Sequence, residues 1–337
     1  MEQLNVLGDL HFGCSHDWDR EAINKFIDWF ESFDFGKFEE NELIQLGDIV
    51  DKSSNLGDTI EYVTRFFKIA CKKFKKIYVL GGNHCHKLYK EKSQYASAFL
   101  KHIGEYNQIE TVFKESLILT PNNFHVIMLP YKRVNGKLLD EFYSDELSSK
   151  FYDTQADLLC GHVGIKEPKS FFGGISLNRF KTKRYAFGHI HSRNGLYKKY
   201  YTGSIMPFKI NEEQSELPRC IKVFQRNNNV IKELEIQLPN IITYDKVNLN
   251  DEPQYKKNSD ILVHIYSVVN CKNINQAKNL YPDYYIHGIE KKYEQLTTTT
   301  SIKDIFMTPI EALYQMIKEK KIIIKRKTMG LIEELLK

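Results

Sequence analysis

Five times before residue 192, a short apolar run ends in a glycine that is followed by aspartate, asparagine or histidine. The five motifs are GDLH at 8–11, GD at 47–48, GNH at 82–84, GH at 161–162 and GHIH at 188–191. Glycine lets the backbone turn sharply, so that the next side chain points into the crevice beyond the carboxyl end of a strand. Open α/β sheets bind their ligands in that crevice. We therefore expect five strand ends to meet at one site.

The segments between the first three motifs alternate between strand and helix patterns. The apolar runs LNVL, ELIQL and KIYVL each end in a motif and are expected to be strands. Between them, apolar residues recur at helical spacing in two stretches: Ile23, Phe26, Ile27 and Phe30, and then Ile60, Val63, Phe67, Ala70 and Phe74. Strands that alternate with helices predict parallel strands covered by helices.

From residue 109 the pattern becomes richer in strands. Turn residues separate the expected strands LILTP, FHVIMLPY, DLLCGH, RYAFGH, YYTGSI, CIKVF and NVIKELEIQL, with one helix expected near 136–150. The fold class we expect is α/β, with two facing mixed β-sheets flanked by helices, and we assign this layered domain to residues 1–238.

The remaining 99 residues divide into two further parts. Residues 239–296 contain SDILVHIYSV, a helix expected at 273–280 and YYIHGIEKKYE, which predict a small α+β domain. Residues 297–337 begin with the linker TTTTS and continue with two short amphipathic stretches, which predict a helical tail.

Composition excludes several classes of protein. With 42% hydrophobic and 27% charged residues, the chain is an ordinary folded protein. Its six cysteines lie far apart without a CxxC pair, which indicates reduced thiols and a cytoplasmic location. No apolar run approaches the roughly 18 residues of a membrane span, and no GxxxxGK[ST] loop is present, so the chain is not an ATPase of that type. A net charge of +5 beside 43 acidic residues does not decide whether a polyanion binds.

The strand-end motifs supply a mixed set of oxygen and nitrogen donors. The candidates are Asp9, His11, Asp48, Asn83, His84, His162, His189 and His191. Such a set suits manganese, iron or zinc, and it has enough donors for two ions. A single GD or GH after a strand is common, and a lone histidine is more often structural, but the joint order of five motifs favours a metal site. His16 and His86 lie in the same loops and could contact substrate, whereas His102, His125, His264 and His287 are expected to be structural.

The order D-x-H, GD, GNH, GH, GHxH resembles that of the calcineurin-like metallophosphoesterases and spans residues 8–191. Within that superfamily, GDIVDKS, LLCGHVG, the block FGHIHSRNGLYKKYYTGSIMPF and the small domain that follows resemble the SbcD-type recombination nucleases. These are bacterial and phage relatives of the eukaryotic meiotic-recombination nuclease. The modest length of the chain resembles the compact form carried by large bacteriophages.

The resemblance implies a set of roles. Asp9, His11, Asp48 and His191 would hold one metal ion, and Asp48, Asn83, His162 and His189 the other, with Asp48 bridging. His84 would be the catalytic side chain, which contacts the phosphate and helps the leaving oxygen depart. The resemblance also implies two Mn²⁺ ions, with Mg²⁺ as the alternative, a homodimer, and cleavage of DNA as a 3′-to-5′ exonuclease and structure-dependent endonuclease. An SbcC-type coiled-coil ATPase would be the partner, and the tail at 297–337 would either dock on it or fold back on the phosphoesterase core.

Two departures from the resemblance bear on function. Cys85 follows His84 where the family usually has a carboxylate, which leaves open how His84 is oriented. A phosphatase or phosphodiesterase acting on other substrates stays an alternative, although Lys52 and Ser53 replace the arginine and glycine that protein phosphatases have after GDxVD. A non-catalytic scaffold subunit is the third possibility.

Overall fold

The computed structural model describes residues 2–13, 17–51, 57–89, 92–95, 106–131, 149–166, 174–208, 212, 215–228, 230–257 and 262–290. The chain divides into two units, 1–290 and 291–337, and the second lies outside the described residues. The linker and helices predicted for the tail therefore lie outside them. So does the helix predicted near 136–150, apart from a 3-10 turn, η4 (Ser149–Phe151), at its end.

The larger sheet has six strands in the order β12-β11-β1-β2-β3-β6. The strands are β1 (Glu2–Leu7), β2 (Asn41–Gln45), β3 (Lys76–Leu80), β6 (Ile109–Val112), β11 (Cys220–Asn227) and β12 (Val230–Gln237). The first four are parallel to one another, in agreement with the alternation of strand and helix patterns. Next to β1 on its other side, β11 runs antiparallel, with Phe224 opposite Leu4.

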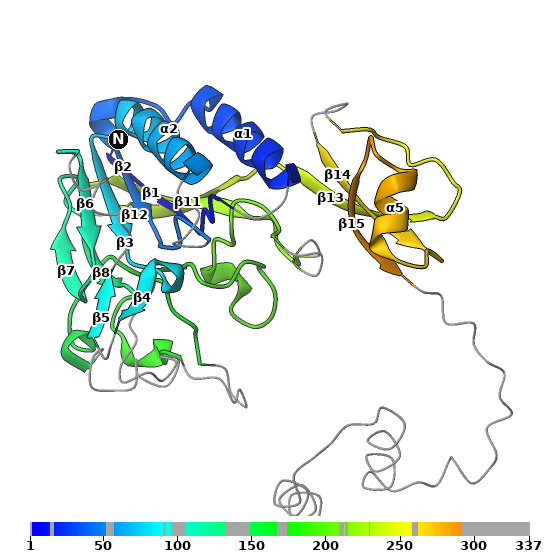
Figure 1. Ribbon diagram of the computed structural model, residues 1–337. Coiled ribbons are helices and arrows are strands. Elements are labelled where there is room, and N and C mark those ends of the chain that lie inside the picture. Colours follow the sequence, from blue (N-terminus) through cyan, green and yellow to red (C-terminus); the bar gives the residue numbers. More distant parts are fainter. Residues whose placement is uncertain are drawn as a thin grey trace, which may run out of the picture. The chain divides into compact units, whose positions relative to one another are not determined.

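Two helices, α1 (Asp17–Ser32) and α2 (Gly57–Lys73), lie along one face of this sheet (Figure 1). Their apolar stripes meet between them, where the rings of Phe30 and Phe66 have centroids 4.7 Å apart. Residues of β3 alternate between two clusters, because successive side chains of a strand point to opposite faces. Ile77 packs in the cluster under the helices, whereas Tyr78 faces the other way.

A second sheet faces the first and has the order β10-β9-β8-β7. Its strands are β7 (Ser116–Leu119), β8 (His125–Leu129), β9 (Leu158–Gly161) and β10 (Tyr185–Phe187). Val126 and Met128 pack against β1 and β2 residues between the sheets, while Ile127 and Leu129 pack outward against loop residues. The predicted α/β sandwich of two facing sheets is confirmed. Of the two facing sheets, only the larger one is flanked by α-helices in the described part of the chain.

Residues 242–290 form a third sheet of three parallel strands, β13 (Ile242–Asn248), β14 (Val263–Val269) and β15 (Tyr285–Glu290), with the helix α5 (Ile274–Leu280). The predicted helix begins where expected, because the side chain of Asn273 accepts the amide of Gln276 at 2.9 Å. The pattern analysis did not predict β13. This part contacts α1, where the Tyr285 hydroxyl donates to Glu21 at 2.8 Å. The domain limits at 238 and 296 stay a prediction.

One predicted strand is wrong. In the stretch YYTGSI only Tyr201 pairs, in an isolated bridge with Phe187. Gly203 turns the chain with φ +75°, a conformation in which glycine is favoured. The next two amides, of Ser204 and Ile205, then donate to the carbonyls of His191 and Asp9 at 3.1 and 3.0 Å. In a strand these two amides would donate to a neighbouring strand. Here they donate to the motif residues His191 and Asp9 instead. A hairpin of β4 (His86–Tyr89) and β5 (Lys92–Tyr95) was not predicted either.

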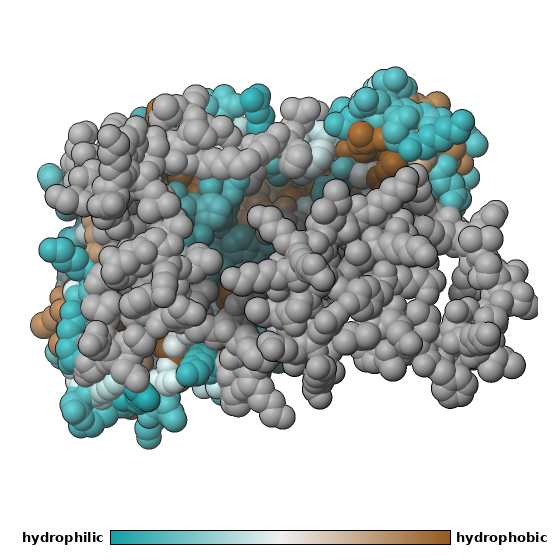
Figure 2. All heavy atoms as spheres, turned by 60° about the horizontal axis from the view of Figure 1, so that its bottom comes forward, coloured by the Kyte–Doolittle hydropathy of each residue, from teal (hydrophilic) through white to brown (hydrophobic). Residues whose placement is uncertain are grey.

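Figure 2 shows one face, on which hydrophilic residues predominate and hydrophobic ones occur in smaller groups. Among the described residues, no helix is both long and apolar enough to span a membrane.

Candidate metal centre

Five strand ends meet at one place, as the motifs predict. The motif residues follow their strands directly: Asp9 and His11 after β1, Asp48 after β2, Asn83 and His84 after β3, His162 after β9, and His189 and His191 after β10. Parallel strands end at the same edge of a sheet, and the two sheets face each other with these edges together. The structure therefore brings all eight candidate residues into one cluster.

The turns after the strands require unusual backbone conformations. His11, Asp48 and His189 adopt positive φ angles of 44°, 46° and 77°, which cost energy for residues other than glycine. Gly82 passes so close to Asp48 that a Cβ atom on it would lie 2.2 Å from the Asp48 backbone nitrogen. The GNH glycine is therefore needed for space, and the strained residues are those expected at a functional site.

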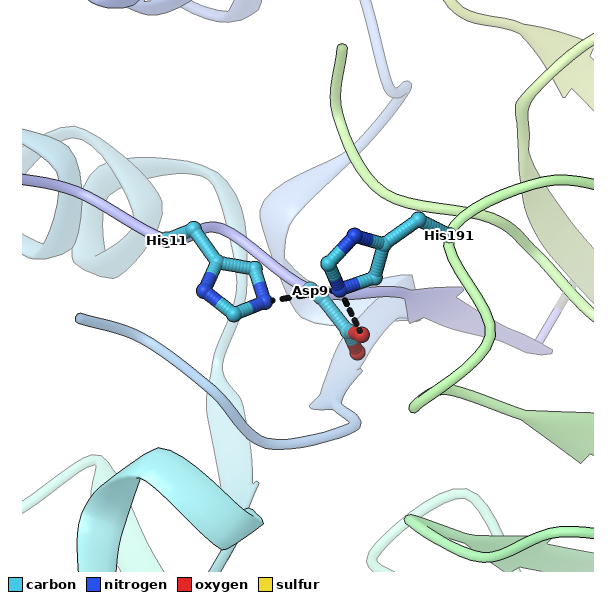
Figure 3. Close-up of side chains that lie close together, drawn as sticks. All are labelled: Asp9, His11 and His191. Carbon is cyan, nitrogen blue, oxygen red and sulfur yellow. Dashed lines mark hydrogen bonds and ion pairs between the residues drawn. The ribbon is translucent and has the colours of Figure 1, made fainter. Parts of the chain in front are cut away.

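Asp9, His11 and His191 form one group of facing donors (Figure 3). The Nε2 atoms of His11 and His191 are 2.9 Å apart, and His191 Nε2 lies 3.6 Å from Asp9 Oδ2. Asp9 is fully buried and His11 is 2% exposed. These two ring nitrogens can share one hydrogen, or they can both direct a lone pair at a cation beside the buried carboxylate. This triad fits a divalent cation.

Asp48 lies between this triad and the remaining candidates. Its Oδ2 atom is 3.6 Å from His11 Nε2 and 3.3 Å from His162 Nε2. On the far side, Asn83 Oδ1 lies 2.7 Å from His162 Nε2 and 2.9 Å from His189 Nδ1. One carboxylate thus faces donors of both predicted ligand sets, which is the position that a bridging ligand needs.

His84 also approaches Asp48, with its Nε2 4.0 Å from Asp48 Oδ2, and its backbone N–H donates to Asp48 Oδ1 at 2.8 Å. Distance alone does not distinguish His84 from the proposed metal ligands, because His11, Asp48 and His84 also form a group of donors close enough to hold a metal ion. Its side chain is 34% exposed, however, whereas His11 and His162 are buried. His84 is therefore more accessible to a substrate than these two imidazoles.

Oxygen atoms of the chain fix the orientation of three imidazoles. The Nδ1 atom of His162 lies 2.8 Å from the carbonyl of Leu46, and that of His191 lies 3.1 Å from Glu212 Oε1. His84 Nδ1 contacts the carbonyl of Asp51 and, at 3.3 Å, its carboxylate. When Nδ1–H donates to such an oxygen, the Nε2 lone pair is left for a metal or a substrate. All three Nε2 atoms face the centre of the cluster.

The electrostatics of the cluster also suit cations. Burial raises the pKa of Asp9. Burial would raise the pKa of Asp48 as well, but the charge of His162 outweighs it and holds that pKa far below the usual range. In turn, the two aspartates overcome the burial of His162 and raise its pKa to about 9. Burial, and then the charge of His162, lowers the pKa of His189 to about 3. A proton on His162 thus balances buried negative charge, and a metal ion bound there would displace it.

Asp51 and Glu212 were missed by the sequence reasoning, although both contact candidate residues. Asp51 carried a signal, because it stands three residues after Asp48 within GDIVD. Its carboxylate approaches His84, so a carboxylate is supplied to that imidazole although residue 85 is cysteine. Glu212 carried none, because it lies among several acidic residues in NEEQSE.

Comparisons with known proteins agree with this site. A family model, Calcineurin-like phosphoesterase, matches residues 4–193, which include all eight candidates. No curated protein matches the chain. A solved structure of a protein of unknown function from Aquifex aeolicus, AQ665, is 11% identical and covers 50% of this chain and 83% of its own. Its TM-score of 0.28 is too low to bear on the fold or the function.

Proposed function

The chain belongs to the calcineurin-like phosphoesterase family, and we propose that within it the protein is a metal-dependent DNA nuclease of the SbcD type. It cleaves phosphodiester bonds as a 3′-to-5′ exonuclease and a structure-dependent endonuclease. The observation that supports the phosphoester chemistry best is the convergence of two aspartates, an asparagine and five imidazoles at five strand ends.

Two divalent ions occupy the centre in this proposal. Asp9, His11, Asp48 and His191 hold one, and Asp48, Asn83, His162 and His189 hold the other. Mn²⁺ is the expected metal, with Mg²⁺ as the alternative. When bound, the pair activates a water molecule and stabilises the attacking and leaving oxygens of an in-line displacement. The position of the Asp48 carboxylate between the two ligand sets supports its role as the bridge.

His84 is the proposed catalytic side chain. The Asp51 carbonyl and carboxylate engage its Nδ1, so that its Nε2 faces the cluster. An imidazole that carries hydrogens on both nitrogens can contact a phosphate oxygen through Nε2–H and donate that proton to the leaving oxygen. Proton transfer by a positioned imidazole is worth about 10²- to 10⁴-fold in rate. Asp51 orients this imidazole.

Basic residues before and after the GHIH motif in the sequence support DNA as the substrate. Residues 174–208, which carry the GHIH motif, contain seven lysines and arginines and no aspartate or glutamate. Some are paired elsewhere, as Lys181 is with Asp153, but Lys183 and Lys199 are exposed. Cations of this kind contact the phosphates of a nucleic acid and do not read its sequence. A polyanionic substrate fits this stretch better than a small neutral one.

The regions after residue 238 have accessory roles in the proposal. The small domain caps the site and contacts DNA, and its packing on α1, shortly after the Asp9–His11 motif, is consistent with that role. There, Trp18 and Tyr285 have ring centroids 6.0 Å apart. The tail at 297–337, outside the described residues, docks on an SbcC-type coiled-coil ATPase, and the nuclease acts as a homodimer. Deleting residues 301–337 and measuring ATPase pull-down tests the docking role, which unchanged binding would exclude.

The central experiment is a nuclease assay with Mn²⁺ or Mg²⁺ on a linear duplex and a defined hairpin. The wild-type protein should degrade both, and Asp48→Ala should lose activity together with metal. His84→Ala should lose activity, by about 10²- to 10⁴-fold, while its metal content measured by elemental analysis stays that of the wild type. Activity retained in both variants would refute the mechanism.

Two other results would redirect the assignment. Rapid hydrolysis of a small phosphodiester such as bis-p-nitrophenyl phosphate, without DNA binding or cleavage, would identify a phosphodiesterase with another substrate. Tight binding of DNA or of the ATPase without cleavage under any metal would identify a scaffold subunit.

A further inference from the structure

We propose that Glu212 is a positioning residue, which fixes the metal-binding tautomer of His191. Together with the 203–208 segment, Glu212 supports the ligand triad Asp9, His11 and His191 selectively. The inference rests on the metal centre of the proposed function and does not depend on DNA as the substrate.

The Glu212 carboxylate is engaged through both of its oxygens. Oε1 lies 3.1 Å from His191 Nδ1, and Oε2 accepts the backbone N–H of Phe208 at 2.9 Å. The backbone carbonyl of Glu212 accepts a hydrogen bond from the Arg219 guanidinium. Because its side chain is only 12% exposed, competition from water is limited. The carboxylate is therefore held in place before any metal binds.

This contact determines which nitrogen of His191 can bind a metal. A neutral imidazole has one N–H donor and one lone pair, and an acceptor at Nδ1 places the hydrogen there. The lone pair is then on Nε2, which lies 2.9 Å from His11 Nε2 and 3.6 Å from Asp9 Oδ2. Glu212 thus selects the tautomer that directs the lone pair at the triad.

The segment before Glu212 contacts every member of the triad. Its amides at Ser204 and Ile205 donate to the carbonyls of His191 and Asp9. The Phe208 ring packs edge-on against His11 and His191, with centroids 5.0 and 5.7 Å away. Since Glu212 also binds the Phe208 amide, one carboxylate ties this segment and the His191 ring together.

The second predicted ligand set has supports of its own. His162 is fixed by the Leu46 carbonyl, and Asn83 Oδ1 contacts both His162 and His189. Loss of Glu212 should therefore weaken one ion far more than the other. Removal of an outer partner of a metal-binding histidine typically costs about 10- to 100-fold in metal affinity.

The test is Mn²⁺ binding to Glu212→Gln by titration calorimetry, with electron paramagnetic resonance to distinguish a coupled Mn²⁺ pair from single ions. His191 and Phe208 contact different oxygens of Glu212, and glutamine replaces one of these acceptors by an NH₂ donor, so it cannot keep both contacts. We expect the wild type to bind two ions, and Glu212→Gln to bind one with unchanged affinity and the other about 10- to 100-fold more weakly. Glu212→Asp, which keeps both acceptors, should lie between the two.

Glu216→Gln is the matched control, because Glu216 is an exposed glutamate nearby that pairs with Lys198 and the Gly195 amide. It should bind both ions like the wild type. The ion that Glu212→Gln retains reports that this variant is folded.

Equal affinities in Glu212→Gln and the wild type would overturn the inference, and so would an equal loss of both ions in Glu212→Gln and Glu212→Asp. A wild-type protein that binds no metal would overturn the metal centre and this inference with it. Two bound ions without DNA cleavage would overturn only the proposed substrate, and the comparison of variants would still decide the role of Glu212.

Discussion

Replacing Glu235 by alanine is expected to destabilise the fold by about 3 kcal/mol, although Glu235 lies on the edge strand β12. The reason is its partner, Arg193, which has no exposed surface. The guanidinium donates to both carboxylate oxygens, Nη2 to Oε1 at 2.6 Å and Nη1 to Oε2 at 3.0 Å. Glu235→Ala would leave this buried charge with only the carbonyls of Pro218 and Lys198.

The expected loss of stability follows from how deeply Arg193 and Glu235 are each buried. Removing one partner of a buried ion pair costs about 3 to 5 kcal/mol. Glu235 is 36% exposed, so water can reach the vacated space, and we expect the lower end of that range. Lys222, which lies 3.7 Å from Glu235, keeps its closer partner Glu233 at 2.5 Å and should add little.

Urea unfolding followed by circular dichroism measures the effect. Asp153→Ala, which breaks the exposed pair of Asp153 and Lys181, is the control and should unfold like the wild type. Adding Arg193→Met to Glu235→Ala should restore part of the lost stability, because the double variant no longer buries an unpaired charge. A Glu235→Ala variant as stable as Asp153→Ala, or a double variant less stable than Glu235→Ala, would refute the reasoning.

The same ion pair predicts a dependence on pH. Burial raises the pKa of Glu235, but the hydrogen bonds and charge of Arg193 outweigh it and lower that pKa below its ordinary value of 4.5. A carboxylate with a lowered pKa contributes stability above the unfolded-state pKa and loses it as the pH falls through the folded-state pKa. The difference in stability between the wild type and Glu235→Ala should therefore be full at neutral pH and shrink below pH 4.5.

Three further substitutions test the site. Asp51→Ala should lower turnover about 10- to 100-fold, because His84 loses the carboxylate that orients it; unchanged turnover in a kinetic assay would contradict this role. Gly82→Ala should reduce bound Mn²⁺ in elemental analysis, because its Cβ would meet the backbone nitrogen and Oδ1 of Asp48, and full occupancy would show that the turn adapts. Cys85→Asp should leave turnover near that of the wild type, since Asp51 already provides a carboxylate; a large rise would show that a tuning group is missing.

The location of the site could be predicted from the sequence because each strand end is marked by a short local motif. A glycine after an apolar run ends a strand, and parallel strands present their ends at one edge. Asp9 and Asp48 therefore had to come close once β1 and β2 were assigned. The distances between donors suggest which of them share an ion. These distances depend on how the two sheets pack face to face, and no local sequence pattern encodes that packing.

Long-range partners could not be predicted for a related reason. Glu212 reaches His191 through a turn at Gly203, in a stretch whose apolar and β-branched residues are typical of a strand. The pattern was misread because the amides of Ser204 and Ile205 bind motif residues instead of a neighbouring strand. Arginine is usually exposed in proteins, and only the fold places Glu235 beside Arg193.

The position of β1 has a consequence for how the protein is made. This strand is synthesised more than 200 residues before its neighbour β11, and Leu4 pairs with Phe224. At about 5 to 20 residues per second, the ribosome needs on the order of tens of seconds between the two. During that interval β1 can pair with β2 but keeps an open edge, on which another nascent chain could add a strand. The strand that leads into Asp9 is thus protected only after residue 227 has been made, so slow translation before residue 220 should increase aggregation more than slow translation after residue 227.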